Sequence, residues 1–187
     1  GGDMGGDMGG DMGGDMGGHM GGDMGGHMEV RDESATEATD LAMEMAQGEG
    51  GFESLGSEGT FSVAGDMDTR GFADLGGAGT LDMIDAMGQD QFLELEGDKM
   101  AGMFDAMDHT QMESMGNDQM FEAAQSMDQS ALAGMGADSA FSMFETIGGG
   151  VDNLGGDKMA GMFDAMGADN IGSIGGEAIF DMVGGMN

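Results

Sequence analysis

The sequence predicts an all-α protein, a short α-solenoid of helix-turn-helix repeats of about 20 residues that follows a disordered Gly/Met-rich tail. Three observations predict it. An apolar position recurs at spacings of 20, 20, 20, 20, 19 and 20 residues, at Leu55, Leu75, Leu95, Met115, Met135, Leu154 and Ile174. Glycine follows this position directly in six of the seven copies. Between these positions, apolar residues fall at the i, i+3, i+4, i+7 spacing of one helical face.

A β-solenoid with one coil per copy is the alternative fold. It would need Val, Ile and Thr at every second position. The repeated positions instead hold Met, Ala and Asp at helical spacing, which favours helices.

Residues 1–28 consist of five Gly-Gly-Asp-Met and two Gly-Gly-His-Met tetrads. Half of these residues are glycine, whose ordering costs the most backbone entropy, so we expect a disordered tail. Residues 29–39 (EVRDESATEAT) are predicted to be an acidic linker. The repeat domain is expected at 40–187, with about seven copies and a partial eighth. Because the chain begins at Gly1, we expect it to be a processed form or a fragment.

The copy at 98–116 shows the predicted helices most clearly. Met100, Met103, Phe104 and Met107 form one apolar face over residues 98–107. A second, shorter helix carries Met112 and ends at the glycine at position 116. The sequence GDKMAGMFDAM of this copy recurs unchanged at 156–166.

Most methionines are explained by this frame. Of the 19 methionines after the tail, all but Met45 fall in the repeated apolar positions, where other copies hold Leu, Ile, Val or Phe. We therefore predict that they form the core, where the flexible thioether fills irregular gaps. The alternative is a soft-metal site, because Met100, Met103 and Met107 offer three thioethers on one helical face.

Acidic residues also keep a repeated position, just before or within the first turn of the longer helix of each copy. Carboxylates there are predicted to cap free N–H groups and to complement the helix dipole. A ladder of cation sites is the alternative. The residues are Glu58, Asp98, Asp118, Asp138, Asp157 and Glu177.

Composition excludes several functions. With 37 acidic and 4 basic residues the net charge is -33, so nucleic acids and anionic membranes are not expected partners. Cysteine is absent, and the only histidines are His19, His27 and His109. No activated nucleophile, phosphate loop or EF-hand pattern is present, so we predict a protein that is not an enzyme. The compartment is left open, with an extracellular or periplasmic location slightly favoured.

One segment carries a family resemblance. Residues 107–115 (MDHTQMESM) resemble the Met-Asp-His-Ser-rich segments of bacterial copper-resistance proteins. In that family, runs of Met and His are thought to collect copper outside the cytoplasm. The segment has Thr and Gln where the family tends to have Ser and Lys. The resemblance implies binding of copper or silver.

Packing does not explain the methionines of the tail. Their thioethers, with two adjacent imidazoles, form a candidate site for Cu(I) or Ag(I), and many weak sites on one chain raise the effective concentration of each. An inert spacer and a target for sacrificial oxidation are the alternatives. The candidate ligands are Met4, Met8, Met12, Met16, His19, Met20, Met24, His27 and Met28.

Two functions follow. The first is a non-enzymatic acidic repeat scaffold or interaction module with a flexible Met-rich tail, whose partner is another protein or a second copy of the chain. The alternative is sequestration of Cu(I) or Ag(I) by the tail methionines and histidines.

Overall fold

The computed structural model describes residues 32–48 and 50–174, and across them the secondary structure is helical, without a strand. The predicted all-α class is confirmed, and the β-solenoid alternative is excluded for this part of the chain. Residues 31–187 make up one compact unit.

Each sequence copy gives one longer helix and one short helical segment. Helices α3 and α10 each join one of each kind across a glycine with non-helical backbone, Gly76 (φ 74°) and Gly167 (φ 68°). The elements are α1 (Glu33–Gln47), the 3-10 helix η1 (Phe52–Leu55), α2 (Gly56–Asp66), α3 (Thr69–Met87), α4 (Gln89–Phe92), α5 (Gly97–Ala106), α6 (His109–Met115), α7 (Asn117–Ser126), α8 (Gln129–Ala133), α9 (Ala137–Ile147), the 3-10 helix η2 (Gly148–Asn153) and α10 (Gly156–Ile174).

The predicted linker is wrong over residues 33–39, which belong to α1. Ala35, Ala38 and Ala42 lie on one side of this helix and are buried, together with Thr39. Small residues at helical spacing form a packing face as readily as large ones, which the acidic composition of the segment hid. The predicted tail (1–28) and the partial eighth copy beyond Ile174 lie outside the described residues.

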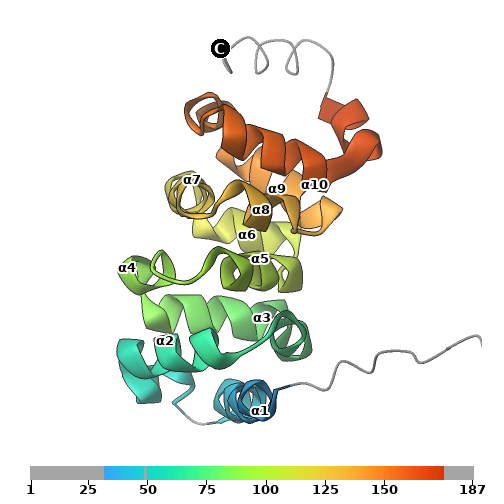
Figure 1. Cartoon of the computed structure of the whole chain (residues 1–187). Coiled ribbons are helices and arrows are strands. Elements are labelled where there is room, and N and C mark those ends of the chain that lie inside the picture. The colour runs from blue at the N-terminus through green and yellow to red at the C-terminus, as the bar shows by residue number, and fades with distance from the viewer. Residues whose placement is uncertain (1–31, 49, 175–187) are drawn as a thin grey trace, which may run out of the picture. The chain divides into compact units, whose positions relative to one another are not determined.

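The helical segments fall into three columns (Figure 1). One column runs from α1 through the first part of α3 to α5, α8 and the first part of α10. The second runs from η1 through the second part of α3 to α6 and α9. The third contains α2, α4, α7 and η2. Longer and shorter segments alternate along each column.

Among the described residues, six hydrogen bonds between segments that are far apart in the sequence join residues 31–34 positions apart. The Ser57 hydroxyl donates to Gln91 Oε1 over 2.7 Å, and Asn170 Nδ2 donates to the Ala137 carbonyl over 3.1 Å. Gln89 Nε2 donates to Glu122 Oε2 in the same way. Neighbours in a column are therefore three helical segments apart, not one sequence copy apart. We call three successive segments, one from each column, a coil.

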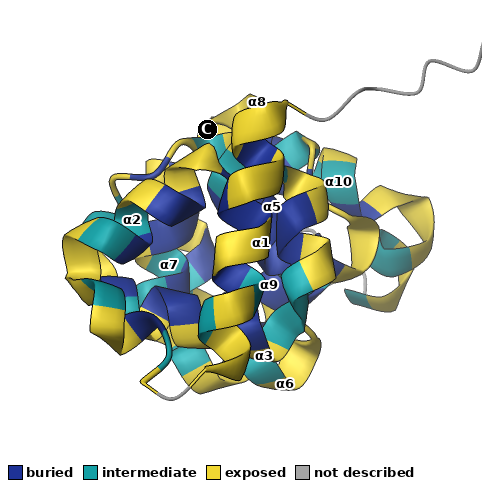
Figure 2. Cartoon of the chain, turned by 90° about the horizontal axis from the view of Figure 1, so that it is seen from below, coloured by how far each residue is buried: buried dark blue, intermediate teal, exposed yellow. Residues whose placement is uncertain are grey.

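The core lies between the columns, and Figure 2, which looks along them, shows buried residues on the inner sides of the helices. The position of Met107 illustrates the predicted repeated apolar positions, because it is buried in every described copy except the first, where Gln47 is exposed. At this position the chain has Met67, Met87, Met107, Met127, Ile147 and Met166. Phe92 and Phe104 meet edge to face within this core, with ring centroids 5.9 Å apart.

The two identical segments occupy equivalent places in one column. Lys99 donates a hydrogen bond to the Met67 carbonyl, and Lys158 donates one to the Met127 carbonyl. These carbonyls lie at the C-terminal ends of helices, where a cation is stabilised by the helix dipole. Identical sequence therefore makes the same contact twice, two coils apart.

Candidate functional site

The predicted metal ligands of the tail, Met4 to Met28 with His19 and His27, lie outside the described residues. Among the residues that the structure does describe, no group of three or more His, Cys, Asp or Glu side chains is arranged to hold a metal ion. The alternative site at Met100, Met103 and Met107 lies in the core, where all three side chains are buried. Met100 Sδ accepts a hydrogen bond from the Ser126 hydroxyl at 3.7 Å.

The segment that resembles copper-resistance proteins does not bring its donors together. Met107 and Met112 point into the core, whereas the His109 side chain is 45% exposed on the outside of α6. His109 Nε2 lies 3.4 Å from Glu113 Oε1, one helical turn further on. Packing thus separates the thioethers of this segment from its imidazole.

The repeated acidic position lies in the first turn of α2, α5, α7, α9 and α10, as predicted for its described members. The predicted capping hydrogen bonds are not made by these carboxylates. Capping is performed by Asp68, Asp108 and Asp128 at the short helical segments, where each accepts from a backbone N–H over 2.7–2.9 Å. These aspartates directly follow the buried position of Met107 in their copies.

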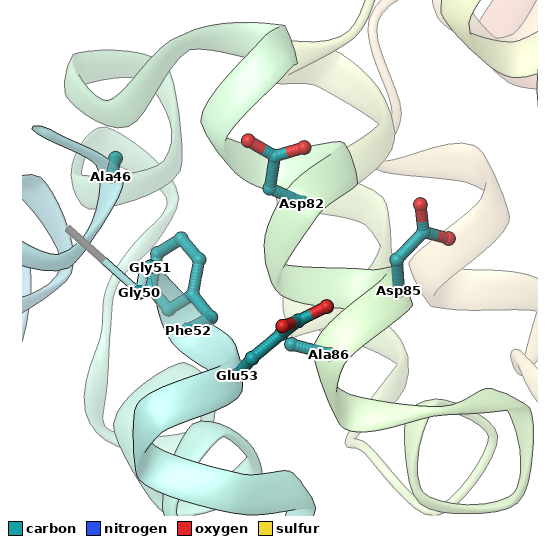
Figure 3. Close-up of a pocket in the computed structure, with 8 residues that line it drawn as sticks. All are labelled: Ala46, Gly50, Gly51, Phe52, Glu53, Asp82, Asp85 and Ala86. Atoms are coloured by element: carbon teal, nitrogen blue, oxygen red, sulfur yellow. The ribbon is translucent and has the colours of Figure 1, made fainter. Parts of the chain in front are cut away.

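A first acidic pocket of about 380 Å³ lies between η1 and the second part of α3 (Figure 3). Asp82 and Asp85 come from α3, and Glu53 comes from the opposite side. The ring of Phe52 is the large apolar side chain of the lining. This pocket offers carboxylates alone as polar side-chain groups.

A second pocket, of about 540 Å³, lies between α5 and α6 on one side and α9 on the other. Its polar side chains are more varied, because a histidine and two serines join the carboxylates. They are Asp105, Asp108, His109, Asp138, Ser139 and Ser142. We call this the α5–α6–α9 pocket, and it is the candidate site because it combines carboxylates with an imidazole and two hydroxyls.

The serines of the α5–α6–α9 pocket are the residues that the sequence interpretation missed. Ser139 and Ser142 are each only 9% exposed, on the face of α9 that also buries Thr146. Their spacing of i, i+3 and i+7 was the available signal, because it places three hydroxyls on one buried helical face. These hydroxyls belong to neither the apolar period nor the charged positions, so those two patterns do not select them.

Comparison with known proteins adds no family to this picture. No protein-family model, curated protein or solved structure matches the chain. In the described part of the chain, no helix combines the length and the apolar character that crossing a membrane requires.

Proposed function

We propose that the repeat region is a non-enzymatic α-solenoid scaffold that presents an acidic surface to a protein partner, with residues 1–28 as a flexible extension. The burial of the repeated methionines carries this proposal. Fourteen of them are buried, and buried thioethers contribute to packing instead of binding ions at the surface. Hydrogen bonds at a constant separation of 31–34 residues also support stacked coils.

The charge supports the choice of partner. A net charge of -33 attracts basic molecules over long distances and repels nucleic acids and anionic membranes. The positive ends of Lys99 and Lys158 are directed to main-chain carbonyls inside the helical unit. A basic protein surface is the complement of such a scaffold.

Sequestration of soft metals by the tail is the second candidate. It rests on the sequence of residues 1–28, where each Gly-Gly-Asp-Met or Gly-Gly-His-Met tetrad carries a methionine and half of the residues are glycine. The tail would then bind Cu(I) or Ag(I) through thioethers and the imidazoles of His19 and His27.

A competition titration for Cu(I) separates the two functions. The full chain and a truncation to residues 29–187 compete with a chromophoric Cu(I) chelator under reducing, anaerobic conditions. For the scaffold, we expect neither protein to remove Cu(I) from the chelator. Retention of several ions by the full chain alone would replace the spacer with a metal-binding tail.

A third result would contradict both assignments. Equal Cu(I) binding by the full chain and by residues 29–187 would identify the methionines of the repeats as ligands. Replacing Met103 and Met107 with leucine in the truncated protein is the matched control, because it removes two thioethers and keeps two apolar side chains.

A further inference from the structure

The α5–α6–α9 pocket has unused hydrogen-bonding capacity that its neighbours do not satisfy. Among the described residues, no hydrogen bond is made by the hydroxyls of Ser139 or Ser142, although each residue is 9% exposed. These hydroxyls are not sealed in the protein interior, because the one sealed and unpaired side-chain atom of the described residues is Thr146 Oγ1. They therefore face the pocket. Hydroxyls that face a pocket and have no protein partner are available to donate to, or accept from, a bound group.

The carboxylates of the pocket are only half used. Asp105 Oδ1 accepts from the Gly136 N–H over 2.8 Å, and Asp108 Oδ1 accepts from the Gln111 N–H over 2.9 Å. The described residues give no hydrogen bond to the Oδ2 atoms of these two residues or to the carboxylate of Asp138. Three carboxylates thus hold free acceptors beside two serine hydroxyls.

These acceptors define the chemistry of the occupant. No lysine or arginine lines the pocket, so a bound group must bring several donors and a positive charge. A metal ion does not fit, because the acidic side chains and His109 are not arranged around one point. A guanidinium group has five N–H donors in one plane and pairs with carboxylates through two bonds at once, so it fits acceptors spread over a wide pocket.

We infer that the α5–α6–α9 pocket receives an arginine side chain of a basic protein partner. This inference rests on the proposed scaffold function, and it names the group that the scaffold recognises. Arginine is among the residues that contribute most to protein interfaces when it fills a pocket. The surrounding charge of -33 steers a basic partner towards the scaffold, and the hydroxyls select the place at which it binds.

Amide NMR of the ¹⁵N-labelled full chain tests the inference, with acetyl-Gly-Arg-Gly-amide as the probe. The titration is run in about 0.15 M NaCl, where the Debye length is about 8 Å and diffuse attraction is weak. We expect the amides of residues 105–109 and 136–142 to shift together and to saturate. The first acidic pocket is the internal control, because Glu53, Asp82 and Asp85 supply carboxylates without buried hydroxyls. The amides of the first acidic pocket should report an affinity for the arginine peptide that is about tenfold weaker.

Two matched probes separate guanidinium recognition from general attraction. The citrulline peptide keeps the shape of arginine without its charge and should cause no saturable shift. The lysine peptide keeps the charge without the planar fork and should bind about tenfold more weakly. Equal binding of arginine and lysine at both acidic pockets, lost on adding salt, would mean diffuse counterion attraction and would overturn the inference.

Replacing both serines tests the hydroxyls themselves. The double variant Ser139→Ala/Ser142→Ala should lose about tenfold in affinity for the arginine peptide. Ser130→Ala, at an exposed position of α8, is the matched control and should bind as the wild type does. Unchanged affinity in the double variant would refute the role of the pocket.

The readouts keep the two proposals distinct. A well-dispersed amide spectrum without arginine binding would refute the pocket and leave the scaffold intact. Tight Cu(I) binding by the tail would refute the spacer role of residues 1–28 without moving the arginine response of α9.

Discussion

Met103 has no exposed surface and lies on the apolar face of α5 beside Phe104. The same position is buried as Val63, Met83, Ala123, Met143 and Met162 in other copies. Complete burial of one such side chain contributes roughly 1.5–3 kcal/mol to folding. A core built mainly from methionine is adaptable, because this side chain has three rotatable bonds and accepts neighbours of several shapes.

Changing Met103 to aspartate should therefore lower the free energy of unfolding by several kcal/mol, because it buries an unpaired charge. Met103→Leu keeps the volume and should cost less than about 1.5 kcal/mol. Urea unfolding followed by circular dichroism at helical wavelengths measures both. A cost of less than about 0.5 kcal/mol for Met103→Asp would show that this position is not in the core.

The sequence predicted the core residues better than the caps. Apolar positions could be aligned because the period and the helical spacing both select them. A residue caps a helix only if it lies at the cap position itself, and a displacement of one or two residues removes this ability. The backbone at that position must also be extended. Asp108 has that extended conformation, whereas Asp118 lies within the first turn of α7, beyond the cap position.

At the scale of single helices, two glycines show how closely the segments approach. Gly102 of α5 is buried against the first part of α3, and a Cβ added to it would lie 2.9 Å from Thr69 Cγ2 and 3.2 Å from Phe72 Cδ2. Gly65 of α2 is exposed, and a Cβ added there would meet nothing within 4 Å. Neither requires an unusual backbone, so the two positions differ in packing alone.

Gly102→Ala should thus destabilise the protein by about 1–3 kcal/mol, because the added methyl group forces α5 away from α3. Gly65→Ala should stabilise it by about 0.4–1 kcal/mol, because alanine loses less backbone entropy in a helix. Thermal unfolding of both variants beside the wild type gives the comparison. Stabilisation by Gly102→Ala would mean that α5 and α3 do not pack as described.

The sequence predicted elements where the apolar pattern was strong and failed where small or polar residues did the packing. The predicted helices at 98–107 and around Met112 correspond to α5 and α6. The start of α1 was missed because its face is made of alanines, and the α5–α6–α9 pocket was missed because its buried residues are serines. Burial of small polar residues depends on neighbours that the local sequence does not specify.

For the whole molecule, repulsion among like charges opposes folding. The chain carries 37 acidic against 4 basic residues, and folding brings these carboxylates closer together. Added salt shortens the Debye length from about 30 Å at 0.01 M to about 10 Å at 0.1 M and weakens this repulsion.

Stability should consequently rise as NaCl increases over this range, and KCl should act equally, because screening depends on charge and not on the identity of the cation. The urea midpoint of the full chain, determined at each salt concentration, reports the effect. A midpoint that does not change with salt would mean that the carboxylates are too far apart to repel. A response to only one of the two cations would point to specific ion binding.

The arrangement of copies in space was the least predictable feature. The repeat of about 20 residues can be read directly from the sequence, but the hydrogen bonds between layers span 31–34 residues. A copy contains two helical segments, whereas a coil contains three. No residue pattern within one copy specifies that a coil has three segments. The number of segments in a coil is set by the angles at which the bends between segments turn the chain.

This mismatch has a consequence for how such a gene can change in length. Two coils contain six segments, which equals three copies, so the two periods coincide only there. The identical segments 97–107 and 156–166 are 59 positions apart and make the same lysine contact. A duplication or loss of that length returns each segment to its own column, whereas the gain of a single copy moves every later segment to another column. Three copies are therefore the smallest change in length that leaves each segment in its column.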